Sequence, residues 1–161
     1  YDNDVHSEEL ISRVSRQYAG SASCESCHPG FLEAWSDFGH FSAYQTIVDE
    51  EALEDRECTR CHAVGFIEEP RLLTYDLIPE DYRNIGCEGC HPNGRRHITT
   101  QEQLANLDEE RREQMLSTDS MLNTVITAAN CTPCHTGDWA VGFDYNASME
   151  EAAERCRNAA R

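Results

Sequence analysis

The sequence contains no lysine, and it has no apolar run long enough to cross a membrane. Its 13 basic residues are all arginine and stand against 30 acidic residues, so the formal net charge is -17. A surface this acidic argues against nucleic acid or an anionic membrane as a partner. It fits a basic partner, bound cations or a saline medium, and it fits equally well an acidic face that is simply solvated.

Apolar residues are also scarce. Hydrophobic residues make up 39% of the 161 positions, and the mean hydropathy is -0.65. A chain of this length has room for one domain, but this apolar content is low for a conventional core. We therefore expect a bound group to supply part of the buried apolar surface.

Cysteine is abundant by comparison, and its spacing is regular. Eight of the nine cysteines fall into four Cys-x-x-Cys-His units. This unit is typical of c-type haem attachment, in which two thiols bond one porphyrin and the histidine becomes an axial ligand of its iron. Zinc sites and thiol redox pairs also use paired cysteines, but neither needs a histidine at the same place four times. The predicted haem-bonding cysteines are Cys24, Cys27, Cys58, Cys61, Cys87, Cys90, Cys131 and Cys134.

Four haems would take their first axial ligand from the histidines that close these units. Two further histidines follow a unit closely: His40 comes twelve residues after His28, and His97 comes six residues after His91. If the chain after His28 is helical, His40 lies roughly 18 Å further along. We therefore expect His40 and His97 each to ligate a haem other than the one beside it in the sequence. The predicted proximal iron ligands are His28, His62, His91 and His135.

The number of histidines is one too few. Four haems with two histidines each need eight, and the chain has seven. The seventh, His6, lies outside any haem unit, so it is either a solvated side chain or a distal ligand. At least one iron must therefore remain open or take its second ligand from elsewhere.

The sequence pattern predicts a mainly α fold with long irregular loops and little or no sheet, dominated by its haems. We expect residues 1–23 to form an N-terminal extension with a short helix capped by Ser7, available as an inter-subunit arm. Residues 24–161 should form a single tetrahaem domain. Later helices are predicted to begin at capping boxes, formed by Thr99 with Glu102 and by Ser148 with Glu151.

The run YAGSASCESCHPGFLEAWSDFGH resembles the opening of the tetrahaem cytochrome c-554 family. The Val-Gly-Phe after the second unit and the run GCEGCHPNGRRH are similar to that family too, and the resemblance covers roughly residues 18–136. It implies that His97 ligates haem 1, the haem on His28, and that His40 ligates haem 3 or haem 4. It also implies that haem 2, on His62, lacks a distal histidine.

The C-terminal part departs from that family pattern, because no histidine follows His135. His6 can fill the gap if it reaches across its own subunit or onto a neighbouring one. Extracellular cytochrome filaments, which this architecture resembles, donate histidines between subunits, and such a head-to-tail contact generates a fibre. The ninth cysteine, Cys156, is then either an intersubunit disulfide partner or an inert thiol.

These observations predict electron transfer through four covalently bound c-type haems, with redox proteins or further copies of the chain as partners. The expected form is a polymerising extracellular cytochrome. The alternatives are a soluble periplasmic shuttle and an enzyme that acts on nitric oxide, nitrite or hydroxylamine at an open haem on His62. Met115, Met121 or a main-chain group are the other candidates for that open position. Because c-type haem is attached outside the cytoplasm, we expect an extracellular or periplasmic location, with a signal peptide removed before Tyr1.

Overall fold

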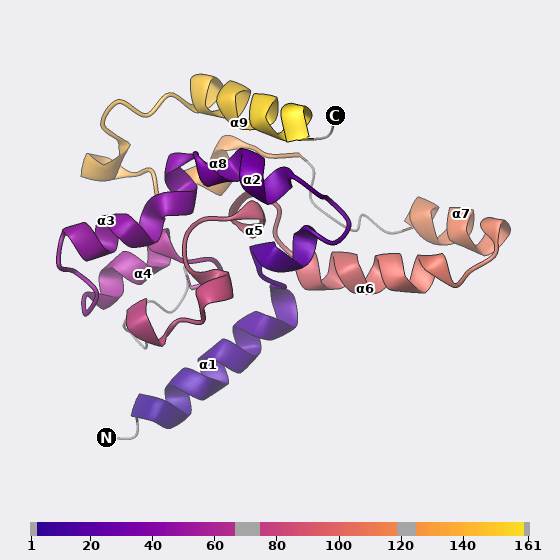
Figure 1. The fold of residues 1–161 in the computed structure, drawn as a ribbon, viewed down its shortest axis with the longest axis horizontal. Helices are drawn as coiled ribbons and strands as arrows, with labels where there is room; N and C mark the ends of the chain where they lie inside the picture. Colours follow the sequence, from indigo (N-terminus) through magenta and orange to yellow (C-terminus); the bar gives the residue numbers. More distant parts are fainter. Residues whose placement is uncertain (1–2, 67–74, 119–124, 160–161) are drawn as a thin grey trace.

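The computed structural model describes residues 3–66, 75–118 and 125–159, and helices dominate them (Figure 1). The prediction of a mainly α fold is confirmed. Between the helices, the described residues contain no strand beyond isolated bridges from Ala63 to Arg83 and Asn84. The described α-helices are α1 (Asn3–Gln17), α2 (Phe31–Ser36), α3 (Ala43–Asp49), α4 (Arg56–His62), α5 (Cys87–Cys90), α6 (Gly94–Ala105), α7 (Glu109–Thr118), α8 (Ala128–Cys131) and α9 (Tyr145–Ala159).

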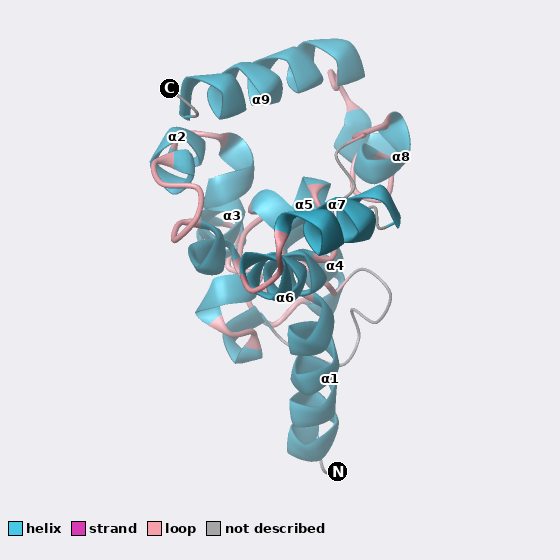
Figure 2. Cartoon of the chain, turned by 90° about the vertical axis from the view of Figure 1, so that its right-hand side faces the viewer, coloured by secondary structure: helices cyan, strands magenta, loops and turns pink. Residues whose placement is uncertain are grey.

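Short 3-10 turns join several of these helices. They are η1 (Ser21–Cys24), η2 (Gly39–Ser42), η4 (Tyr75–Leu77), η5 (Glu80–Tyr82) and η6 (Gly137–Ala140). Helices α1 and α9 lie at opposite ends of the molecule, and the N-terminal end of α1 points away from the other elements (Figure 2). Among the described helices, none has the length and apolar character needed to cross a membrane.

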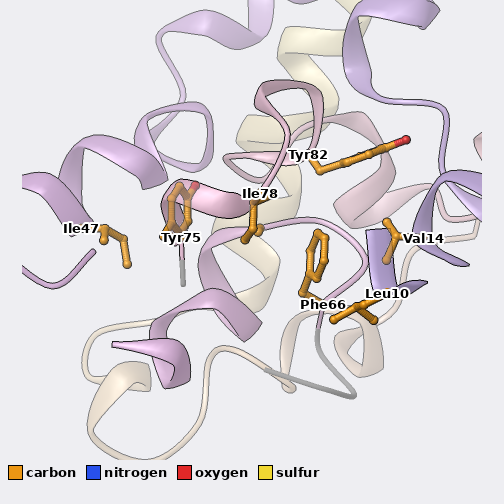
Figure 3. Close-up of a cluster of buried hydrophobic side chains, with 8 residues drawn as sticks. Leu10, Val14, Ile47, Phe66, Tyr75, Ile78 and Tyr82 are labelled. Carbon is orange, nitrogen blue, oxygen red and sulfur yellow. The ribbon is translucent and has the colours of Figure 1, made fainter. Parts of the chain in front are cut away.

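The hydrophobic core is small and includes the N-terminal helix (Figure 3). Leu10 and Val14, one helical turn apart on α1, are both only 4% exposed. They belong to one cluster with the following buried side chains: Ile47, Ala63, Phe66, Tyr75, Ile78 and Tyr82. Helix α1 therefore packs into the same core as later segments, while the predicted domain boundary at residue 23 stays a prediction.

Buried Tyr75 has a partner on both sides of its hydroxyl group. The hydroxyl donates to the carbonyl oxygen of His62 at 2.7 Å and accepts from the backbone N–H of Asn84 at 2.9 Å. Because a buried phenol is costly without such partners, the two bonds fix how the segment around Tyr75 sits on the end of α4. The core thus contacts the second Cys-x-x-Cys-His unit through the hydrogen bond from Tyr75 to His62.

Three helices begin earlier than the predicted caps. Helix α1 begins at Asn3 rather than after Ser7, and α9 begins at Tyr145, where Asp144 accepts from the N–H of Ala147 at 3.0 Å. Helix α6 begins at Gly94, directly after Asn93 in the left-handed conformation. Thr99 therefore lies inside α6, where its hydroxyl donates to the Arg95 carbonyl at 3.0 Å.

Candidate functional site

Each Cys-x-x-Cys-His unit includes one turn of helix. The backbone N–H of the histidine donates to the carbonyl of the first cysteine at 2.9 Å in the units of His28, His91 and His135, and the unit of His62 lies within α4. Residues at i, i+3 and i+4 share one face of a helix, so this turn places both thiols and the imidazole on the same side. That is the arrangement needed to attach and ligate one porphyrin.

Local caps support two of these turns. Asp55 precedes α4 and accepts from the backbone N–H of Glu57 at 3.0 Å. Thr127 and Asn130 form a capping box at the start of α8, in which Asn130 accepts from the Thr127 N–H at 3.0 Å. Ser, Thr, Asp and Asn are favoured at helix starts because their side chains satisfy backbone donors there. The start of the helix that contains the second unit and the start of the helix that leads into the fourth are thus fixed by nearby residues.

The rings of His28 and His97 stack on each other, with centroids 6.4 Å apart and planes inclined by 24°. The buried Nδ1 of His97 has no hydrogen-bond partner among the described residues, and such an atom is costly unless a bound group satisfies it. Bonds from imidazole nitrogen to a metal are about 2 Å long, so two rings on opposite sides of one iron have centroids roughly 6 Å apart. The pair has the spacing expected of two axial ligands.

A second pair of histidine rings brings His40, which follows the first unit, to His135 of the fourth unit. The His40 and His135 rings have centroids 5.9 Å apart and planes at 88°. Phe38 flanks His40 with 4.9 Å between centroids, and Phe143 stacks on His135 at 4.0 Å. This pair also has the spacing of two axial ligands, and its aromatic neighbours restrict how the rings can turn. Of the two haems that the resemblance allows for His40, the structure brings it to the histidine of haem 4.

The surroundings of both added histidines favour the neutral imidazole. Burial lowers the pKa of His40, and the nearby His135 lowers it further. Burial likewise lowers the pKa of His97, and His28 adds to the effect. Neutral imidazole is the form that ligates a metal, because its nitrogen lone pair is then available. The charge state therefore agrees with the geometry of the two pairs.

His62 is oriented by a main-chain contact. Its Nδ1 lies 2.8 Å from the carbonyl oxygen of Ala43, on α3. A metal-ligating histidine usually donates its second ring N–H to a carbonyl or carboxylate, which fixes the tautomer and leaves the other nitrogen for the metal. The described ring contacts bring no second histidine to His62.

The cysteines place the four units in two neighbouring pairs. Cys24 and Cys87 share a side-chain hydrogen bond that raises the pKa of Cys24 and lowers the pKa of Cys87 to about 7. Cys61 and Cys134 share another, which raises the pKa of Cys134 and lowers that of Cys61 to about 7. The first unit therefore adjoins the third, and the second adjoins the fourth. Porphyrins attached to these cysteines would lie close together.

The remaining predicted site residues are described by their position in the chain. His91 closes the third unit and is partly buried, and His6 lies within α1, with its side chain outside the described part of the structure. Met115 is on α7, which Figure 1 shows on the opposite side of the molecule from α4 and His62. Met121 lies outside the described residues. The candidates for an open position at His62 therefore no longer include Met115.

Cys156 lies on α9 near the third unit. Burial raises the pKa of its thiol, and the charge of Cys87 adds to this shift. A raised pKa reduces the thiolate fraction, which is the reactive form. This favours the inert thiol over the intersubunit disulfide.

The donor set suits a porphyrin better than a bare metal ion. Among the described residues, no group of three or more His, Cys, Asp or Glu side chains could hold an ion by itself. A haem iron needs only two ligands from the protein, because the porphyrin supplies the other four. The paired imidazoles meet that requirement, and tetrahedral zinc with four protein ligands does not fit them.

Residues 23–92 match the protein family described as cytochrome c554 and c-prime. Over this segment the chain is similar to c554-type multihaem cytochromes. The matched segment contains the first three Cys-x-x-Cys-His units, while His97 and the fourth unit lie beyond it. Neither the curated proteins nor the solved structures contain a match to the chain. This similarity supports covalently bound haem c and haem-based electron transfer.

Sequence reasoning missed one buried residue beside this site. Glu88 lies between the two cysteines of the third unit, is only 4% exposed and accepts backbone hydrogen bonds from distant segments. The sequence offers no signal that separates it from the many exposed glutamates. Only the fold reveals that its carboxylate is enclosed.

Proposed function

We propose that the chain carries four c-type haems and passes electrons among them. The observation that carries this proposal is the pairing of a unit histidine with a distant histidine, His28 with His97 and His40 with His135. Haem iron, when bound, alternates between its ferric and ferrous states and so carries one electron at a time. At the two paired sites, ligation by two imidazoles would leave no open position for a substrate.

The chain's own residues supply the continuity that electron transfer needs. The contacts of Cys24 with Cys87 and of Cys61 with Cys134 support close approach of the first haem to the third and of the second to the fourth. His40 and His97 each tie one unit to another part of the chain, which supports a fixed distance between centres. A redox titration of the holoprotein followed by visible absorbance tests this. We expect reversible reduction in several overlapping one-electron steps. If redox mediator dyes of suitable potential do not reduce the holoprotein, the proposed function is contradicted.

Within this function we propose that the protein polymerises head to tail into an extracellular wire. Outside the pairs His28–His97 and His40–His135, the remaining histidines are His62, His91 and His6. His6, in the first turns of α1, lies outside the haem units and can serve as a second ligand to the haem on His62 or to the haem on His91. The N-terminal end of that helix points away from the other elements, which supports donation of His6 to a neighbouring copy (Figure 2). Such a contact does not close on itself and therefore extends.

Negative-stain imaging separates the wire from a soluble periplasmic shuttle. Filaments are expected for the unmodified holoprotein, and His6→Ala should abolish them while the exposed neighbour Glu9→Ala keeps them. Uniform single particles from the unmodified protein would overturn the wire and leave the shuttle. An extracellular or periplasmic location goes with both forms, because c-type haem is attached outside the cytoplasm.

An open haem on His62 is the competing reading, and one observation favours it. His62 is oriented by the Ala43 carbonyl, yet the described ring contacts give it no second histidine. An iron held there on one side only would bind a small ligand such as nitric oxide, nitrite or hydroxylamine. Carbon monoxide added to the reduced protein tests this: a shift of the absorbance bands supports the open site, and an unchanged spectrum overturns it.

A further inference from the structure

A single buried carboxylate joins three segments of the proposed haem site. Glu88 accepts from the N–H of Ala19 at 3.0 Å to each of its two oxygens, from the N–H of Gly20 at 2.8 Å and from the N–H of Gly94 at 3.0 Å. Its side chain belongs to the third Cys-x-x-Cys-His unit, between Cys87 and Cys90. All these partners are backbone donors, so their positions depend on the fold rather than on flexible side chains.

Each segment held by Glu88 leads to a predicted haem-binding residue. Ala19 and Gly20 directly precede the turn that carries Cys24, and Gly94 is the first residue of α6. His97 lies on the first turn of α6, with its N–H bonded to the Asn93 carbonyl at 3.1 Å. Glu88 therefore connects the third unit with the first unit and with the histidine that faces His28.

Two glycines make this close approach possible. A Cβ atom at Gly94 would collide with the Glu88 carboxylate, and one at Gly86 would collide with the Ser21 hydroxyl. The Ser21 hydroxyl in turn accepts from the N–H of Cys87 at 3.2 Å. The lead into the first unit and the start of the third are thus in direct contact, with no space for larger residues.

The geometry selects the ionised carboxylate. Every partner recorded for the two oxygens is an N–H donor, and a protonated carboxyl would have to turn its own O–H towards one of them. Burial raises the pKa of Glu88, while the backbone donors and the nearby Arg95 act in the opposite direction. Carboxylates that accept several backbone N–H bonds are stabilised in their charged form. Glu88 is therefore a fixed negative charge in the interior, near Cys24 and Cys87.

We propose that Glu88 is a positioning residue that locks the first and third haem units and His97 in register, and that its charge lowers the reduction potentials of the haems on His28 and His91. This inference rests on the proposed four-haem function. A buried anion stabilises the ferric state, which carries one more positive charge than the ferrous state. The Glu88 carboxylate thus both positions the two units through its hydrogen bonds and places a negative charge near their haems.

Glu88→Gln tests the charge, with Glu102→Gln on the exposed face of α6 as the matched control. Both are measured as holoproteins by redox titration beside the unmodified protein. For Glu88→Gln, part of the titration curve should move to higher potential by on the order of tenfold in the ferric-to-ferrous ratio, which is ~59 mV for one electron. The control should superimpose on the unmodified protein. A Glu88→Gln curve that superimposes on the control would overturn the proposal.

Gly94→Ala tests whether Glu88 positions His97, because this variant keeps the Glu88 carboxylate. It is the deciding variant if Glu88→Gln does not accumulate as holoprotein. The added methyl group should displace the carboxylate, move the start of α6 and loosen His97, so a high-spin ferric signal should appear. A spectrum with no high-spin signal beyond that of the unmodified protein contradicts the inference. If the unmodified protein itself lacks covalent haem or reversible reduction, the proposed function fails. If the unmodified protein has both properties but Glu88→Gln leaves the titration curve unchanged and Gly94→Ala leaves the spin state unchanged, only the proposed role of Glu88 fails.

Discussion

The imidazole planes of His40 and His135 stand almost perpendicular, at 88°, with 5.9 Å between the ring centroids. The rings of His28 and His97 are spaced similarly but lie at only 24°. The plane angle matters because it controls the energies of the iron orbitals that the two imidazoles share. If each pair ligates one haem as proposed, the plane angle would distinguish two haems that have the same ligand types.

The first prediction concerns the electron paramagnetic resonance spectrum of the oxidised holoprotein. Near-parallel imidazoles give a rhombic low-spin ferric signal, and near-perpendicular imidazoles give a low-spin signal with one large g value. Both signals are expected, the rhombic one from the His28–His97 site and the other from the His40–His135 site. Removing His40 should abolish the large-g signal and leave the rhombic one. Loss of the rhombic signal instead would show that the pairs are wrongly assigned.

Replacing His97 by alanine should open one iron. The variant is expected to convert one haem equivalent from low-spin to high-spin and to bind carbon monoxide when reduced, because the imidazole facing His28 is gone. The control is Glu102→Ala, an exposed residue on the same helix. A His97→Ala protein with an unchanged low-spin spectrum would show that His97 does not ligate iron.

The N-terminal helix should contribute to the stability of the whole protein. Leu10 is 4% exposed and belongs to the buried cluster that includes Phe66, so Leu10→Ala should lower the free energy of unfolding by about 2 to 5 kcal/mol. Glu9→Ala, at an exposed position of the same helix, should stay within about 0.5 kcal/mol. Chemical denaturation of both holoproteins makes the comparison. Equal stability of the two variants would mean that α1 is a detachable arm.

Alkaline pH should destabilise the protein partly through Tyr75. Burial raises the pKa of this phenol from 10.0 to about 12. Its contribution is therefore fully present below pH 10 and is lost as the pH rises towards about 12, because the unfolded state releases the proton first. The loss should amount to about 2 to 3 kcal/mol.

Tyr75→Phe checks this assignment. The variant should start less stable, because the His62 carbonyl and the Asn84 N–H lose their partner, and its unfolding free energy should fall less steeply across the alkaline range. Tyr145→Phe, in which a half-buried hydroxyl is removed, provides the comparison. An equal alkaline slope in Tyr75→Phe and the unmodified protein would assign the effect to other groups.

The sequence predicts much of the candidate site, because covalent attachment requires a fixed local pattern. The Cys-x-x-Cys-His spacing fits a single helical turn wherever the chain goes. The rings of His40 and His97 each lie near a histidine of another unit, while the expectation that they ligate the haems of those units stays a prediction. The choice of His135 over His91 as the neighbour of His40 was not accessible. It depends on how η2, which carries His40, and the fourth unit lie in three dimensions.

Helix starts were harder to predict, for a related reason. The start of α6 is capped by Glu88, a residue of another element, rather than by Thr99 and Glu102. A local pattern search finds only caps made by adjacent residues. The start of α9 was a different error, since Asp144 was visible in the sequence as a capping residue and Ser148 was chosen instead.

The most direct test of the central claim is the intact mass of the purified protein under denaturing conditions. The account predicts the 18.2 kDa chain plus four covalently attached haems, with no lighter species. The bare chain mass, or a mass with metal that is lost on denaturation, would contradict it.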